Sequence, residues 1–306
     1  MAIAAAHNSG HRAEQLASGM PALLVAAERV AATIVQGVHG RRRVGSGETF
    51  WQYRRYQSGD SAGAIDWRQS GKSQKVFVRE NEWEAAQSIW LWRDGSPSMD
   101  YQSNAAQEPK IDRANLLLLA LASLLLRGGE HVGLYGRDGN ATGASGGRAT
   151  LNRLGAHLMT EQNQAAQNQA TDLPEPGRLP RFAQMVLFGD FLCPMEQIEK
   201  TVKRFADQGA RGHLLQILDP SEEDLPFRGR TEFEGLEGEG RLIIGRVESL
   251  RDDYQRRMAD RRAALVEITR GAGWGFTPHR TDRPPQTALL ALYNALSGML
   301  DPQTGP

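Results

Sequence analysis

The segment that decides the fold is residues 88–98, Ser-Ile-Trp-Leu-Trp-Arg-Asp-Gly-Ser-Pro-Ser. Its first part is nearly all apolar, which is typical of a strand at the centre of a sheet covered on both faces. The part from Asp94 onward has the composition of a turn. A buried strand over 88–93 that ends at a polar loop therefore predicts an α/β sheet with side chains for binding at its carboxyl edge.

The sequence after this turn alternates between helical and extended patterns. An unbroken apolar stretch over 110–127 predicts a buried helix, and a strand over 131–136 follows at once. Further strands are expected at 182–188, 213–218 and about 274–278, and further helices at about 150–159, 195–208, 250–270 and 287–300. This rhythm predicts a doubly wound α/β fold with a mostly parallel sheet.

We expect the chain to divide into an N-terminal segment, a large domain and a tail. Residues 1–84 would hold a helix and a β-rich segment, with one strand at 48–57 and a long extended stretch from 75 to 93 leading into the sheet. Residues 85–300 would form the α/β domain, which an insertion with a hairpin interrupts at about 219–249. Residues 301–306 are a Pro/Gly-containing tail.

Composition narrows the class of protein. Lysine plus arginine and aspartate plus glutamate both total 36 in 306 residues, so no net charge is available to attract nucleic acid, and we expect no such partner. Cys193 is the only cysteine, which excludes an internal disulfide. The N-terminus lacks a signal-peptide pattern, and the most apolar run is too short to cross a membrane. We expect a soluble, cytoplasmic protein.

Two polar loops follow neighbouring strands of the predicted sheet. The first offers Asp94, Ser96 and Ser98 on alternate residues, and the second offers Asp190 after the strand at 182–188. Oxygen ligands of this kind suit Mg²⁺ foremost, with Mn²⁺ or Ca²⁺ as alternatives. The same Asp and Ser residues could instead simply shape a turn and cap a helix.

The pattern Asp94, Ser96, Ser98 before a buried helix resembles the metal-ion-dependent adhesion site of von Willebrand factor A domains. That resemblance implies a von Willebrand factor A-like core, with Asp190 as the second carboxylate. It also implies a ligand threonine from a Gly-rich loop, for which Thr150 is the candidate and Thr142 the alternative. The metal site could also be degenerate.

The upstream sequence is similar to the bacterial domain-of-unknown-function family number fifty-eight. The residues that carry this similarity include Arg55, Tyr56, Gly59, Asp60, Asp66 and Trp67. We expect these residues to be structural, and the tryptophans at 67, 83, 90 and 92 to belong to the core. The family resemblance implies a non-enzymatic adaptor that acts with a MoxR-type AAA+ ATPase in assembling or maturing a protein complex.

Two features leave alternatives open. Residues 59–63, Gly-Asp-Ser-Ala-Gly, match the nucleophile elbow of α/β-hydrolases, so a serine esterase using Ser61 is the alternative function, with Asp219 and His279 in the right chain order. Too little chain precedes this motif to build the sheet that an elbow requires. Arg41-Arg42-Arg43 forms a basic loop that is either solvated or a contact for an acidic partner, and the sequence does not decide between them.

Overall fold

The computed structural model describes residues 22–34, 44–57, 63, 65–72, 75–82, 87–136, 139–165, 172–175, 177–180, 183–238 and 240–299. The chain forms two compact units. One contains residues 1–37 and 87–306, and the other contains residues 38–86. The helix over 22–34, expected to go with the β-rich segment, belongs to the larger unit, where its residues Ala27 and Ala31 are fully buried.

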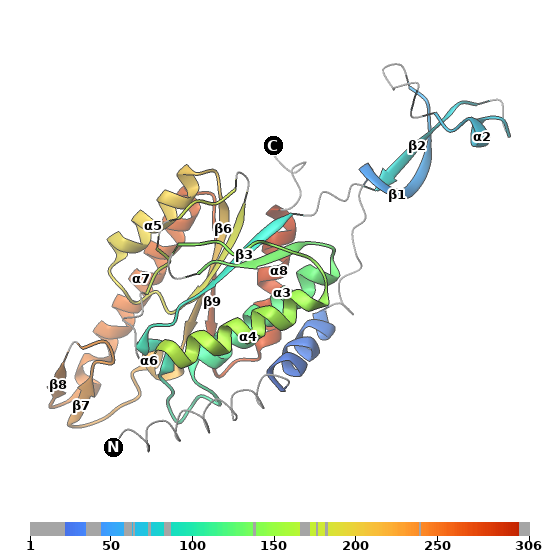
Figure 1. Ribbon diagram of the computed structural model, residues 1–306. Helices are drawn as coiled ribbons and strands as arrows, with labels where there is room; N and C mark the ends of the chain where they lie inside the picture. Colours follow the sequence, from blue (N-terminus) through green and yellow to red (C-terminus); the bar gives the residue numbers. More distant parts are fainter. Residues whose placement is uncertain are drawn as a thin grey trace. The chain divides into compact units, whose positions relative to one another are not determined.

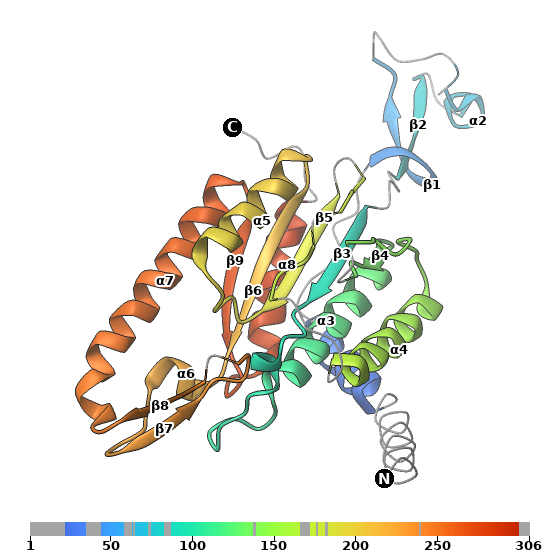
Figure 2. The ribbon, with the colours of Figure 1, turned by 60° about the vertical axis from the view of Figure 1, so that its left-hand side comes forward.

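The larger unit is built on a five-stranded parallel sheet with the order β4-β3-β5-β6-β9 (Figures 1 and 2). Its strands are β3 (Ser88–Arg93), β4 (His131–Leu134), β5 (Gln184–Gly189), β6 (Arg211–Leu218) and β9 (Gly275–Arg280). The chain turns in opposite directions after β3 and after β5, so the topological switch point lies between these two strands. Ligands bind at such a point in doubly wound sheets.

Helices cover both faces of this sheet. The helices are α3 (Lys110–Arg127), α4 (Arg148–Ala165), α5 (Met195–Asp207), α7 (Arg251–Gly271) and α8 (Pro285–Met299). Helix α3 contacts α8, and α5 contacts α7, while α4 contacts α3 and the edge strand β4 (Figure 2). The doubly wound α/β fold expected from the sequence is therefore confirmed.

The apolar strands explain why both faces need cover. Every residue of β5 is buried, and its alternate side chains enter different layers. Met185 and Leu187 join a cluster with Phe205 of α5 and Leu265 of α7. Trp90 and Trp92 of β3 belong to the same cluster, as expected, whereas Trp83 lies outside the described residues.

A hairpin interrupts the larger unit between β6 and α7, in the expected insertion. Strand β7 (Thr231–Glu234) pairs antiparallel with β8 (Arg241–Ile244). The short helix α6 (Pro220–Asp224) precedes the hairpin and begins with a capping box between Asp219 and Glu222. These elements all follow β6, at the carboxyl edge of the sheet.

The smaller unit is a two-stranded ribbon of β1 (Val44–Arg55) and β2 (Phe77–Glu82) with the short helix α2 (Trp67–Ser70). The single extended stretch expected over 75–93 is wrong, because β2 and β3 belong to different sheets. Residues 83–86 between them lie outside the described residues.

Candidate metal site at the carboxyl edge of the sheet

Asp94 is fully buried at this edge of the sheet. Its backbone N–H donates to Phe188 O across 2.7 Å, which places it beside Gly189 at the end of β5. A Cβ on Gly189 would lie 3.0 Å from Asp94 Cβ and 3.1 Å from Oδ2, so the absence of a side chain on Gly189 makes room for the carboxylate. Asp94 Oδ1 accepts from Ser96 N at 2.8 Å, whereas the buried Oδ2 has no hydrogen-bond partner.

Hydrogen bonds connect the two serines to the second acidic loop. Ser96 Oγ lies 2.9 Å from Ser98 Oγ, and Ser98 Oγ donates to Asp190 Oδ2 across 2.8 Å. Asp190 Oδ1 accepts from Leu192 N at 3.1 Å, so backbone contacts fix its orientation. The structure thus brings together four of the five residues predicted as ligands: Asp94, Ser96, Ser98 and Asp190.

Lys110, the first residue of α3, supplies a positive charge at this site. Its Nζ donates to Asp190 Oδ2 at 2.8 Å and to Glu222 Oε1 of α6 at 2.5 Å, and its side chain is 0% exposed. Sequence reasoning missed both Lys110 and Glu222. A lysine at the first position of a buried helix, where the helix dipole disfavours a cation, was the signal that could have pointed to a buried acidic partner.

Burial and charge together perturb the acidity of these groups. Burial raises the pKa of Asp94 well above its usual value, and the nearby Asp190 carboxylate raises it further. Burial alone would lower the pKa of Lys110, but Asp190 and Glu222 outweigh it and raise that pKa. The ionised form of Asp94 is therefore disfavoured, and a cation in addition to Lys110 would stabilise it.

Thr150 does not join the cluster. Residues 141–145 run back antiparallel along β4, with Ser145 opposite Val132, and Gly146 packs near His131 at the start of that strand. His131 is level with Ser88, the first residue of β3, whereas Asp94 follows the last. Six residues of strand separate the two levels, roughly 20 Å. The expectation that Thr150 is a ligand is contradicted by this placement at the opposite end of the sheet.

The hydroxyl groups of both threonines have other partners. Thr150 Oγ1 donates to Gly146 O and lies 2.9 Å from Ser145 Oγ. Thr142 Oγ1 accepts from Leu134 N and donates to Leu134 O, both at 2.8 Å. These two hydrogen bonds attach the loop that contains Thr142 to Leu134, the last residue of β4.

The donor set matches the chemistry of a hard cation. Two carboxylates and two hydroxyls from adjacent loops provide oxygen only, and one carboxylate oxygen is buried without a partner. Among the described residues, no group of three or more His, Cys, Asp or Glu is arranged to hold a metal. A site here would therefore depend on the serines as well as on Asp94 and Asp190.

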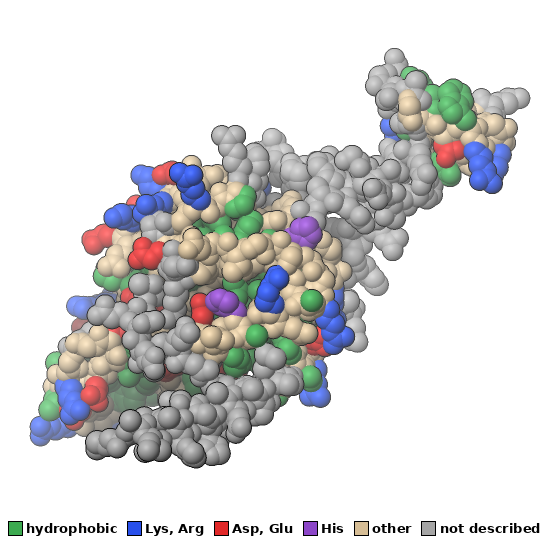
Figure 3. All heavy atoms as spheres, in the orientation of Figure 1, with side chains coloured by type: hydrophobic (Ala, Val, Ile, Leu, Met, Phe, Trp, Pro, Cys, Tyr) green, Lys and Arg blue, Asp and Glu red, His purple; other side chains and the backbone are tan. Residues whose placement is uncertain are grey.

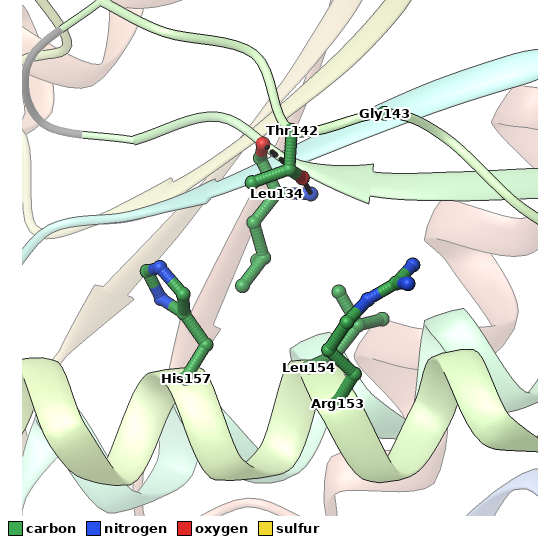
Figure 4. Close-up of a pocket in the computed structure, with 6 residues that line it drawn as sticks. All are labelled: Leu134, Thr142, Gly143, Arg153, Leu154 and His157. Atoms are coloured by element: carbon green, nitrogen blue, oxygen red, sulfur yellow. Dashed lines mark hydrogen bonds between the residues drawn. The ribbon is translucent and has the colours of Figure 1, made fainter.

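A separate pocket of about 330 Å³ lies between the end of β4 and helix α4 (Figure 4). Its lining residues are Leu134, Thr142, Gly143, Arg153, Leu154 and His157. Asp94, Ser96, Ser98 and Asp190 do not line this pocket.

On the face shown in Figure 3, acidic and basic side chains are interspersed over the larger unit, as expected for a chain without net charge.

The comparisons with known proteins identify the family. The sequence-family model described as "Protein of unknown function DUF58" matches residues 52–264 of this chain. The chain belongs to the DUF58 family. The DUF58 match begins within β1 of the smaller unit and ends within α7 of the larger unit.

Two curated relatives of this DUF58 chain are named as uncharacterized proteins. Proteins Mb1516 of Mycobacterium bovis and Rv1480 of Mycobacterium tuberculosis are each 26% identical over 278 residues, which cover 88% of this chain and 86% of theirs. Similar solved structures include the conserved hypothetical protein BatB from Bacteroides thetaiotaomicron, with 14% identity and a TM-score of 0.44 over 70% of this chain and 99% of that one. An aerotolerance-related membrane protein from Bacteroides fragilis matches with 12% identity and a TM-score of 0.37, over 70% and 100% respectively.

The DUF58 signature residues shape the smaller unit where the structure describes them. Asp66 caps α2 by accepting from Gln69 N at 2.8 Å, which agrees with a structural role. Arg55 ends β1, and Tyr56 N donates to Val76 O. Trp67 is 70% exposed, so the expectation that it belongs to the core is wrong. Gly59 and Asp60 lie outside the described residues.

The hydrolase alternative gains no support from the described part of the chain. Ser61 lies outside the described residues, as does the loop Arg41–Arg43. Asp219 Oδ1 accepts from Ser221 N, and His279 Nε2 lies 3.0 Å from Arg113 Nη1. Burial and Arg113 lower the pKa of His279 to about 4, which makes it a weak base.

No helix in the described ranges combines the length and the apolar character that spanning a bilayer would require.

Proposed function

We propose that this DUF58 protein is a non-enzymatic adaptor that binds a partner protein through a divalent cation, Mg²⁺ foremost. Its parallel-sheet unit would be a von Willebrand factor A-like domain with a metal-ion-dependent adhesion site. Asp94, Ser96, Ser98 and Asp190 would hold the cation at the topological switch point. Thr150 has no part in this proposal.

The observation that carries the proposal is the buried, unpartnered Oδ2 of Asp94. A buried carboxylate oxygen without a hydrogen bond is costly unless a proton or a cation completes it. Asp94 lies in one continuous cluster with Ser96, Ser98 and Asp190. A cation beside Asp94 and Asp190 would neutralise both carboxylates and supply a positive point charge for an incoming acidic side chain.

Lys110 supports the site instead of replacing the cation. Its Nζ is bonded to Asp190 and Glu222, on the α6 side of the cluster. Asp94 Oδ2 receives no hydrogen bond from it. We therefore assign Lys110 to balancing Asp190 and Glu222, and the cation to the oxygens of Asp94 and the two serines, with Asp190 shared.

The partner would present a carboxylate to the open position of the cation. A MoxR-type AAA+ ATPase, or the complex that such an ATPase assembles, is the partner that we propose. Metal occupancy would then control when the adaptor binds its partner. Without the cation, the carboxylates of the site would repel the partner's acidic side chain.

A Mn²⁺ titration followed by electron paramagnetic resonance tests this function. We expect one Mn²⁺ to bind the wild type, and Asp94→Asn to weaken binding at least tenfold. Asp100→Asn is the matched control, since Asp100 is an exposed aspartate in the same loop and should leave the affinity unchanged. Equal affinities for wild type and Asp94→Asn would remove the cation from the proposal.

A further inference from the structure

The tip of the β7–β8 hairpin reaches the candidate metal site. Ser98 N lies 3.4 Å from Glu237 Oε1, although the two residues are 139 positions apart in the sequence. Glu237 lies in the turn between the two hairpin strands, and its side chain is exposed. A carboxylate from the insertion therefore stands directly beside a residue that we assign to the cation.

The hairpin is anchored at its base. Arg251, at the start of α7, donates through Nε to Leu225 O and through Nη2 to Phe227 O, both at 3.0 Å. Gly229 N donates to Glu248 Oε2 at 2.7 Å, and Phe227 packs edge-to-face against Phe233. These contacts tie residues 225–229 to Glu248 and to Arg251 at the start of α7.

Beyond its base, the hairpin buries little apolar surface. Leu236, Leu242 and Ile243 are 49%, 61% and 53% exposed. A two-stranded hairpin without a buried face is marginally stable by itself. The position of the tip must therefore depend strongly on polar contacts such as the one between Glu237 and Ser98.

Charge determines when that polar contact is favourable. Asp94, Asp190 and Glu222 already place three carboxylates at the site, where Lys110 contacts two of them. Arg261 lies nearby but donates to the backbone oxygens of Phe191 and Cys193. A further carboxylate is repelled by this cluster unless a cation is present, and it is attracted once the cation is bound.

We infer that Glu237 is the chain's own acidic ligand for this site: it closes the hairpin over the cation and occupies the position that a partner's carboxylate takes. This inference rests on the proposed function. Cation binding and the position of the hairpin tip would be coupled, because the cation would stabilise only the conformation in which Glu237 lies at the site. A partner then binds by displacing Glu237, and the freed hairpin moves its exposed leucine and isoleucine side chains with it.

Hydrogen exchange with Mg²⁺ and Mn²⁺ titration test the inference together on the full chain. We expect Mg²⁺ to slow amide exchange at least fivefold in residues 94–101 and in β7 and β8 of the wild type. In Glu237→Gln, Mg²⁺ should still protect residues 94–101 but no longer the hairpin, and Mn²⁺ affinity should fall threefold to tenfold. Glu232→Gln, which removes a different hairpin carboxylate that pairs with Arg241 at 3.7 Å, is the control and should keep both the Mg²⁺-dependent slowing of exchange in the hairpin and the Mn²⁺ affinity of the wild type.

The outcomes separate this inference from the proposed function. If the wild type binds Mn²⁺ and Glu237→Gln matches it in affinity and in hairpin protection, the role of Glu237 is overturned and the cation site stands. If neither ion binds the wild type, both fail. A hairpin that is equally protected with and without Mg²⁺ also overturns the inference, because closure would then be independent of the cation.

Discussion

Lys110 Nζ donates to Asp190 Oδ2 across 2.8 Å, in a pair whose side chains are 0% and 3% exposed. The pair joins the start of α3 to the loop after β5, and Glu222 extends it to α6. Three loops at one sheet edge are therefore tied together by a single ammonium group. The ion pair and the hydrogen bond from Ser98 Oγ together hold Asp190 Oδ2 at this edge of the sheet.

Replacing Lys110 by methionine should destabilise the fold. Removing one partner of a buried ion pair leaves the other charge uncompensated and costs roughly 3–5 kcal/mol. We expect urea unfolding to show a loss of that size without metal, and Mg²⁺ to restore part of it by neutralising Asp190. Lys203→Met, an exposed lysine on α5, is the control. A Lys110→Met protein as stable as this control would show that the pair contributes nothing.

Gly189→Ala should disturb the site directly. Its new methyl group would press on Asp94 Cβ and Oδ2, at 3.0 and 3.1 Å, with the surrounding strand holding both in place. We expect a loss of roughly 1–3 kcal/mol in the free energy of unfolding and weaker Mn²⁺ binding. Gly271→Ala, at a position where a Cβ meets open space, should change neither quantity by much. Equal behaviour of the two variants would mean that the space beside Asp94 is not tight.

The Thr150→Ala variant tests whether Thr150 contributes to stability alone or also binds the cation. The hydroxyl bonds to Gly146 O and Ser145 Oγ should contribute about 1 kcal/mol to stability. Mn²⁺ affinity should be unchanged, because Thr150 lies at the amino end of the sheet. A tenfold loss of affinity in paramagnetic resonance titrations would return Thr150 to the ligand set.

Stability should fall in mild acid because of buried histidines. Burial lowers the pKa of His213, whose Nε2 lies 2.8 Å from Thr277 Oγ1, to about 4. The unfolded chain, with a histidine pKa of about 6.5, binds more protons between these two values, so acid favours unfolding there. From this group alone the linkage predicts a loss of about 2 kcal/mol at pH 5 relative to neutral pH.

His213→Leu provides the control for this pH dependence. Urea unfolding at a series of pH values should show a shallower fall for the variant than for the wild type between pH 6.5 and 4. Parallel curves would mean that His213 is protonated in the folded protein as easily as in the unfolded chain.

Much of the fold follows from apolar runs and turn residues. The buried apolar run at 89–92 predicted a central strand. The helical and extended segments that alternate after it predicted a parallel α/β sheet, because helices must connect parallel strands. The break between β2 and β3 was not predicted, because the extended pattern from 75 to 93 has no glycine or proline to mark it.

The site was only partly predictable. Asp94 and Asp190 each follow a buried strand, so parallel topology brings them to one edge. Thr150 was assigned from loose spacing, which could not show that residues 141–145 run back along β4. Glu222 and Glu237 lie in the insertion after β6, where neither periodicity nor a motif fixes the path of the chain. Their positions depend on contacts formed only in three dimensions.

Anomalous diffraction from crystals grown with Mn²⁺ is the most direct test of the central claim. The account predicts one manganese peak bonded to Asp94 and the serine oxygens, with Asp190 alongside and Lys110 still bonded to Asp190 and Glu222. Crystals that show no manganese at this edge, with Asp94 Oδ2 still without a partner at saturating Mn²⁺, would contradict it.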